Sequence, residues 1–254
     1  MPGQKTDGHF VNNGTLTIQN GLGISSTISF DNAGLIQVLG GFFIPASLVS
    51  SPTSSVVIGP HGRLLDIATP ITTGTLSNAG TITINYNGPA TTTLGGAGLH
   101  FSNAGMLSIG DGLAIIGDTP IPVLPMTLTS PTASSQVSTF INTGTTAITG
   151  GLLHLFAAQD PATNGSFAVD QHAVLEFAAN YDFSTATGPT LTGSGLVIID
   201  PGVTLTLAAD TAFAGTIQID GTLLIAPPLD ADADAASLLR FTVIDSPVPE
   251  PASL

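Results

Sequence analysis

The stretch that decides the fold is Leu76-Ser77-Asn78-Ala79-Gly80-Thr81-Ile82-Thr83-Ile84. It places an apolar residue, an asparagine and a glycine at every second position, and then alternates polar and apolar side chains. Such alternation is typical of a β-strand, because successive side chains of a strand point to opposite faces. The Asn-x-Gly step predicts a turn, since asparagine and glycine both tolerate a positive φ.

The same pattern recurs along the chain. Clear copies begin at Phe10, Phe30, Leu76, Phe101 and Phe140, weaker ones begin at Leu191 and Phe213, and degenerate ones surround residues 172–177 and Gly62. One copy cannot bury its apolar side chains alone, whereas stacked copies share a continuous core. A spacing of roughly 22 to 23 residues, with room for one extra copy in the gap from residue 101 to 140, is typical of a solenoid.

The sequence therefore predicts an all-β fold, a parallel β-helix or β-solenoid of about ten coils over residues 1–226. We expect it to be right-handed, as parallel crossovers are. An antiparallel β-sandwich is the alternative, although it would not require the same pentapeptide before each strand. The proline-containing stretches 43–60 and 118–135 predict loops or coil corners. Residues 227–247 are expected to form an acidic terminal cap or linker.

The composition excludes several classes of protein. The 254 residues include 17 Asp and Glu but only three Lys and Arg, which gives a formal net charge of -14, and there is no Cys. Three isolated cations form no basic patch, so we expect no nucleic-acid partner. The absence of cysteine excludes disulfides and thiolate metal sites. The mean hydropathy is +0.45, yet no apolar run reaches the length of a transmembrane helix.

An asparagine precedes the turn glycine in the five clear copies. Side-chain oxygens there could serve as ligands for a metal or a small molecule. Because the asparagines follow the repeat, we predict instead a structural ladder, in which stacked amides bond one another and the turn backbone. This turn ladder consists of Asn12, Asn32, Asn78, Asn103 and Asn142.

No motif in the sequence predicts a catalytic, cofactor-binding or metal-binding residue. The acids are scattered at turn-like positions. His172 and Glu176 would share one face of a strand, but no arginine or lysine lies near them in sequence. The five histidines have no metal-ligand spacing. The run from Asp230 to Asp234 resembles the start of a calcium loop, but Ala235 and Phe241 occupy positions that need glycine and glutamate.

Threonine pairs such as Thr15/Thr17 and Thr81/Thr83 suggest a flat hydroxyl surface. At the equivalent positions of other copies the residues are Leu35/Gln37 and Met106/Ser108. These interruptions leave no continuous threonine ladder. Binding to ice or to a carbohydrate surface is therefore only a third functional hypothesis.

The last seven residues are Val248, Pro249, Glu250, Pro251, Ala252, Ser253 and Leu254. They resemble the opening of a PEP-CTERM sorting signal. In that family an apolar transmembrane helix and a basic cluster follow, and an exosortase processes the signal. This chain stops at Leu254, and no apolar signal-peptide core follows Met1. We therefore expect a truncated piece, whose only membrane contact would be that missing helix.

The segment from Asn78 to Ile82 also resembles the passenger repeats of autotransporters and filamentous-haemagglutinin-type adhesins, a likeness that extends loosely over residues 10–225. The two resemblances imply an exported, non-enzymatic protein of the cell surface or extracellular matrix, with a structural or adhesive role. An exosortase-type protease and an exopolysaccharide or cell-surface glycan are the expected partners. A polysaccharide lyase or hydrolase on the same scaffold is the main alternative.

Overall fold

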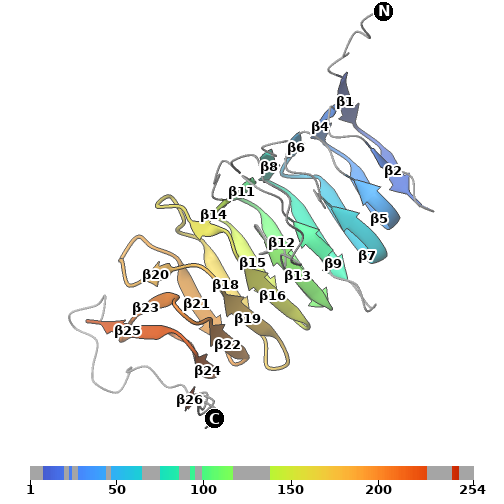
Figure 1. Cartoon of the computed structure of the whole chain (residues 1–254). Coiled ribbons are helices and arrows are strands. Elements are labelled where there is room, and N and C mark those ends of the chain that lie inside the picture. Colours follow the sequence, from blue (N-terminus) through green and yellow to red (C-terminus); the bar gives the residue numbers. More distant parts are fainter. Residues whose placement is uncertain are drawn as a thin grey trace, which may run out of the picture.

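The computed structural model describes residues 8–19, 23–24, 28–43, 47–64, 75–85, 92–94, 99–116, 138–227 and 242–245. These residues form a parallel β-solenoid, in which strands from successive turns lie side by side along one axis (Figure 1). The strand pairs of the four sheets are parallel, and the described residues contain no helix. The predicted solenoid is confirmed, and the antiparallel sandwich is wrong.

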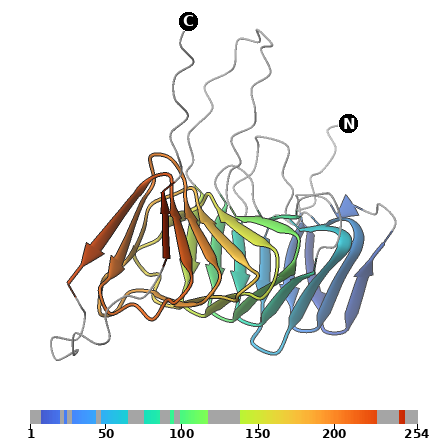
Figure 2. The same ribbon diagram turned by 90° about the horizontal axis from the view of Figure 1, so that it is seen from below.

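Three long sheets form the faces of the solenoid, and the chain passes from one to the next around each turn (Figure 2). The first sheet contains, in spatial order, β1 (Gly8–Asn12), β4 (Ile28–Asn32), β6 (Ser47–Ser50), β8 (Thr75–Asn78), β11 (His100–Asn103), β14 (Thr139–Asn142) and β17 (Ala158–Gln159). The second contains β2 (Thr15–Ile18), β5 (Leu35–Phe43), β7 (Ser55–Leu64), β9 (Thr81–Asn85), β12 (Met106–Asp111), β15 (Thr145–Ile148), β18 (Ser166–Val169) and β21 (Thr190–Gly193), with β3 (Gly23–Ile24) beside β5.

The third sheet contains β10 (Thr92–Leu94), β13 (Leu113–Ile116), β16 (Leu152–Leu155), β19 (Val174–Phe177), β22 (Leu196–Ile199), β24 (Thr216–Ile219) and β26 (Thr242–Asp245). A short fourth sheet at the C-terminal end contains β20 (Tyr181–Phe183), β23 (Thr204–Ala208) and β25 (Thr222–Ala226). The strand β26 pairs with β24 from within the segment that was expected to be a cap or linker.

The register of the sheets builds the core. In the third sheet Leu153, Leu175 and Val197 are successive partners, and all three are fully buried. In the first sheet the rings of Phe101 and Phe140 pack at a centroid distance of 5.0 Å. Each strand thus turns alternate side chains inward, and burial of these columns supplies the main stabilising free energy, about 25 cal/mol per Å² of apolar surface.

The coil count differs from the expected ten. Two of the long sheets hold seven strands each, which corresponds to about seven turns. The strand β14 pairs directly with β11, so no extra coil separates them in the first sheet. The weak copies at Leu191 and Phe213 lead from the second sheet to the third, whereas the clear copies lead from the first to the second. The repeat count therefore combined two different corners of the coil.

The prediction of loops over residues 43–60 is also wrong in part. This stretch contains β6 and the start of β7. Pro52 lies in the turn between them. Pro60 lies within β7, where the register against β5 shifts in a β-bulge, a place where a strand tolerates proline. Residues 118–135 lie outside the described residues.

Glycine is required at these turns for a different reason from the positive φ that the sequence predicts. None of Gly34, Gly105 and Gly144 has a positive φ. A Cβ atom at Gly105 would instead lie 2.0 Å from the backbone oxygen of Gly80 in the preceding coil. The corners of successive coils therefore approach too closely for any side chain, and glycine is required by this contact between coils.

The predicted asparagines meet at this corner, buried inside the coil. The Nδ2 of Asn12 donates a hydrogen bond to Oδ1 of Asn32 at 2.8 Å. Farther along, Asn78 donates to Asn103, and Asn103 donates to Asn142, again at 2.8 Å. The same Nδ2 atoms also donate to backbone oxygens of the following strand, as Asn103 does to Thr145 at 3.2 Å.

The ladder has a gap at Ser50, which stands in register between Asn32 and Asn78. The Oγ atom of Ser50 is buried without a hydrogen-bond partner, and so is Oδ1 of Asn78. A serine side chain is shorter than that of asparagine and has no amide group, so Ser50 does not bridge Asn32 and Asn78. An unpaired buried acceptor costs about 1–3 kcal/mol of folding free energy.

The change Ser50→Asn is expected to raise the free energy of unfolding by about 1–2 kcal/mol, because the new amide accepts from Asn32 and donates to Asn78. Urea denaturation monitored by circular dichroism measures this gain. The matched control is Ser51→Asn in the adjacent turn, which lies off the ladder. Equal or lower stability of Ser50→Asn relative to this control would contradict the assignment.

Candidate functional site

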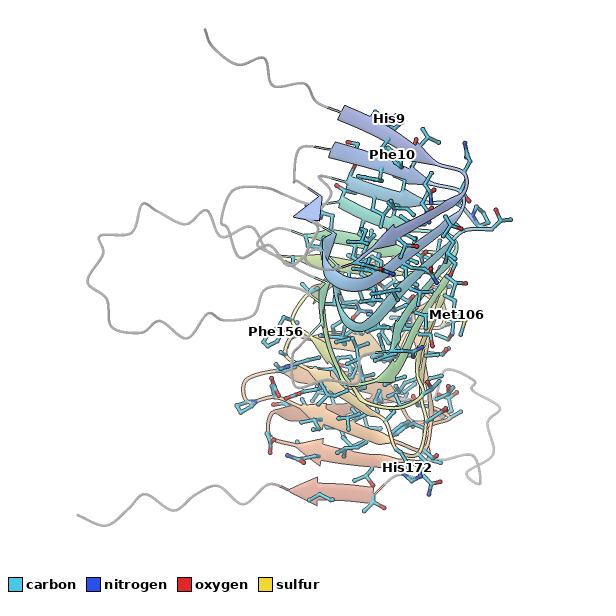
Figure 3. All side chains as sticks on the ribbon, turned by 90° about the vertical axis from the view of Figure 1, so that its right-hand side faces the viewer. His9, Phe10, Met106, Phe156 and His172 are labelled. Atoms are coloured by element: carbon cyan, nitrogen blue, oxygen red, sulfur yellow. The ribbon has the colours of Figure 1, made fainter. Side chains whose placement is uncertain are left out.

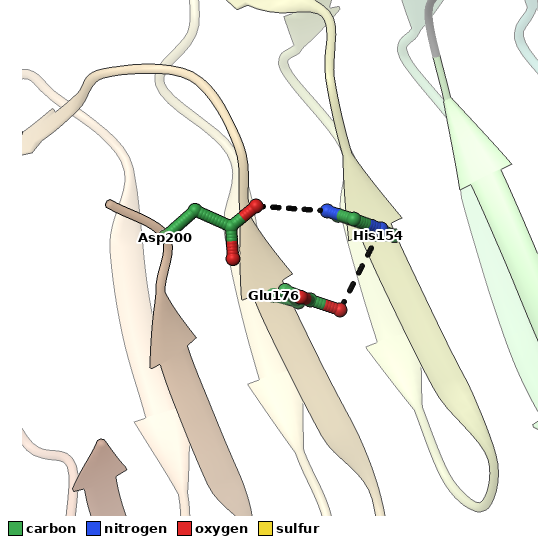
Figure 4. A network of polar contacts seen from close by, with 3 residues as sticks. All are labelled: His154, Glu176 and Asp200. Atoms are coloured by element: carbon green, nitrogen blue, oxygen red, sulfur yellow. Dashed lines mark hydrogen bonds and ion pairs between the residues drawn. The ribbon is translucent and has the colours of Figure 1, made fainter. Parts of the chain in front are cut away.

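Three side chains that can exchange protons or bind a ligand meet on the outer face of the third sheet. His154 is the third residue of β16, and Glu176 is its direct partner in β19. Asp200 follows the last residue of β22, one coil farther along. Figure 4 shows how the three converge from three successive coils. We call them the histidine–carboxylate cluster.

The cluster is compact. The Nδ1 atom of His154 lies 3.5 Å from Oε2 of Glu176, and Nε2 lies 3.3 Å from Oδ2 of Asp200. One ligand atom from each residue can be chosen so that all three lie within 4.8 Å of one another. Between 17% and 25% of each side chain is exposed, so solutes reach the cluster while much of it is shielded from water.

Small and aromatic neighbours set this geometry. Backbone hydrogen bonds from Ala178 to Leu155 and from Asp200 to Phe177 continue the sheet register beyond the strands. Ala178 therefore occupies the rung beside Asp200, and its single methyl group leaves the Asp200 side chain free to extend toward His154. Phe156 lies two residues after His154 in the same coil, and its ring packs against the imidazole, with 4.0 Å between ring centroids. Figure 3 labels Phe156 on one side of the stack and Met106 on the other.

Burial shifts the protonation of the cluster. It raises the pKa of Glu176 to about 7, and a hydrogen bond to Asp200 and the charges of Asp200 and Asp220 act in the same direction. Burial also lowers the pKa of His154, against the opposing effect of the hydrogen bond and charge of Asp200. Near neutral pH the imidazole is thus mainly uncharged, and the glutamate is close to its midpoint.

A third carboxyl group adds to the local negative charge. Asp220 accepts a hydrogen bond from Nε2 of Gln218 at Oδ2, 2.9 Å away. Its other oxygen, Oδ1, is buried without a hydrogen-bond partner. No lysine or arginine is among the side chains that the structure describes. The carboxyls of Glu176, Asp200 and Asp220 therefore face only one imidazole among those side chains.

The sequence did not reveal this cluster. Strand alternation would place His172 on the same face as Glu176, but His172 lies exposed in the turn before β19, so the alternation does not extend to it. Glu176 contacts His154 of the preceding coil instead. The usable signal was a separation of about one coil length between the three residues. Residues 230–234 and 248–254 lie outside the described residues.

The threonines do not gather into one array. In the second sheet the register aligns the first outward positions as Thr15, Leu35, Ser55, Thr81, Met106, Thr145, Ser166 and Thr190. Leucine and methionine interrupt the row, so this face lacks a uniform threonine surface. The longest hydroxyl-bearing run in this row consists of Thr145, Ser166 and Thr190, and Ser166 donates to Thr145 at 3.2 Å.

The raised pKa of Glu176 predicts a pH-dependent cost. A folded-state pKa of about 7, above the ordinary 4.5, means that the folded protein loses stability as the pH rises from about 4.5 to 7. For this partly exposed group the loss is about 1–2 kcal/mol. Glu176→Gln is expected to abolish that loss, so the variant should exceed the wild type in stability at pH 8 but not at pH 4.

Urea midpoints at pH 4, 6 and 8, measured with a chelator present, test this expectation. Asp170→Asn, which changes an exposed turn carboxyl, is the control. A pH dependence of Glu176→Gln that parallels the wild type would show that Glu176 ionises normally.

Comparisons of the chain with protein-family models, with curated proteins and with solved structures found no significant match. Within the part of the chain that the structure describes, no helix is long and apolar enough to cross a membrane. Functional conclusions therefore rest on the residues and the geometry.

Proposed function

We propose that this chain is an exported structural or adhesive solenoid of the cell envelope or extracellular matrix. The observation that carries the proposal is the continuous parallel stack, whose strands keep one register from coil to coil. A stack of this kind is a rod with extended outer faces, and each coil is held by backbone hydrogen bonds to its neighbours. Such a rod suits a spacer or a repeated binding surface.

The chemistry of the surface agrees with a glycan partner. Thr145, Ser166 and Thr190 present hydroxyl groups on successive coils, with two of the three side chains exposed. The hydroxyl groups of sugars can form hydrogen bonds with such groups, because each hydroxyl is both a donor and an acceptor. The few positive charges disfavour phosphate-rich partners. An exopolysaccharide or a cell-surface glycan is therefore the partner that we propose.

The cellular address is supported by the Val248–Leu254 motif and its resemblance to a sorting signal processed by an exosortase. The absence of cysteine is compatible with export, since no thiol is exposed to oxidation. These observations come from the sequence, and they are independent of the hydroxyl groups on which the proposed glycan partner rests.

Antibodies raised against the purified chain test the address in the organism that encodes it. We expect them to label intact cells or the extracellular matrix, whereas antibodies against a cytosolic enzyme label only lysed cells. Changing Pro249 and Glu250 to alanine is expected to prevent normal surface sorting. Detection of the wild-type product in the cytosolic fraction alone would overturn the proposal.

A glycan-cleaving enzyme is the second candidate, and the histidine–carboxylate cluster favours it. Glu176, with a pKa of about 7, lies beside the carboxyl group of Asp200, and such a pair suits a general acid and a second carboxylate. The distance of at most 4.8 Å between their oxygens is closer to the roughly 5–5.5 Å of retaining glycosidases than to the wider spacing of inverting ones. Release of reducing ends from a panel of polysaccharides, absent in Glu176→Gln, would support this candidate.

A further inference from the structure

The histidine–carboxylate cluster has the composition of a metal site. It offers one imidazole nitrogen and two carboxylate groups from three adjacent coils. Each of these coils is held in the third sheet by its backbone, so the ligand positions are set by rigid strands. We propose that His154, Glu176 and Asp200 bind one divalent metal ion of borderline hardness, for which Zn²⁺ is the representative.

The spacing of the donor atoms supports a shared ion. A tetrahedral zinc site with bonds of about 2.0–2.1 Å places its ligand atoms roughly 3.3–3.4 Å apart. The Nε2 atom of His154 and Oδ2 of Asp200 lie 3.3 Å apart, which matches this spacing. Glu176 must move its carboxylate closer to them, and its side chain has the rotatable bonds to do so.

The charges around the cluster favour a cation. Three carboxyl groups, those of Glu176, Asp200 and Asp220, are brought together on this face. Among the described side chains no lysine or arginine compensates them. A bound dication would offset this repulsion. The buried and unpartnered Oδ1 of Asp220 is a further acceptor in the neighbourhood that an ion or its bound water can satisfy.

The ligand types select the class of metal. Calcium and magnesium prefer complete shells of oxygen ligands, whereas an imidazole with carboxylates suits zinc and similar ions. An imidazole donates its lone pair to a metal ion only in its neutral form. Three protein ligands leave one position open, so the ion would also hold a water molecule or a solute group.

Titration of the purified chain with ZnCl₂, after removal of metals with a chelator, tests the proposal. We expect one tight ion per chain. His154→Gln, Glu176→Gln and Asp200→Asn are each expected to weaken binding at least tenfold. Co²⁺ bound in place of Zn²⁺ is expected to show the visible absorption of a tetrahedral centre, and this absorption should be lost in the same variants.

The pair of His9 and Asp31 provides a matched control. Its Nε2–Oδ2 distance is 3.2 Å, almost that of His154 and Asp200, but both side chains are more than half exposed. His9→Gln is therefore expected to leave tight binding unchanged. Melting curves of each variant without metal show whether it is folded.

Three outcomes would overturn the proposal. They are the absence of tight binding, tight binding that survives His154→Gln in a folded variant, and tighter binding of Ca²⁺ than of Zn²⁺.

Discussion

Replacement of Gly105 with alanine is expected to lower the free energy of unfolding by about 3 kcal/mol or more, an effect at the upper end of the range for overpacking. The added Cβ would lie 2.0 Å from the backbone oxygen of Gly80 and 2.6 Å from that of Ala79. The Gly80 oxygen cannot move independently, because it accepts a backbone hydrogen bond from Met106 at 2.8 Å. The two coils must separate at this corner, which weakens the bonds between them.

Gly14 is the matched control, because it occupies the same turn position in the first coil. A Cβ atom there would have no neighbour within 4 Å, and the residue has no positive φ. Gly14→Ala is expected to be neutral, or to stabilise slightly by restricting the unfolded chain. Urea unfolding of both variants measures the difference. Similar effects of the two changes would show that contact between coils is not the reason for the glycine.

Replacement of Asn103 with leucine is expected to cost about 2–4 kcal/mol. Leucine has nearly the shape of asparagine, so the change leaves no large cavity. It removes the bond that Asn103 accepts from Asn78 and those that it donates to Asn142 and Thr145. Oδ1 of the fully buried Asn142 loses its donor, and an unpaired buried acceptor is costly.

The control is Asn164→Leu, since Asn164 precedes Gly165 at an equivalent turn but is exposed. Thermal and urea unfolding of the two variants are expected to differ by at least about 2 kcal/mol. If both changes cost the same, the amide ladder contributes little. The outcome for Ser50→Asn would then also be expected to be neutral.

The sequence allowed the ladder residues to be identified because each copy of the pentapeptide carries its own asparagine. Stacking of equivalent positions then brings Asn78, Asn103 and Asn142 together without further information. The role of the glycines was misassigned, because a local pattern does not show how closely two distant corners approach. The sequence also did not show that the weak copies form the corner between the second and third sheets, since this corner carries residues similar to those of the corner between the first and second sheets.

The histidine–carboxylate cluster could not be predicted for a related reason. His154, Glu176 and Asp200 lie in separate coils, and their meeting depends on the number of residues in each intervening turn. The turn after Ser50 shows how this number varies, since Ser51, Pro52, Thr53 and Ser54 replace a two-residue turn there. A change of one residue in a turn would move an outward side chain to the inner face.

The sequence alone determined the class of fold, the inward columns of the core and the absence of a thiolate from these 254 residues. These properties depend on alternation and composition, which act within a few residues of each position. Only the tertiary structure decided the register between coils, and with it the gap at Ser50, the contact at Gly105 and the meeting of His154 with two carboxylates. The physical reason is that backbone pairing between coils, across turns of unequal length, selects which distant side chains share a rung.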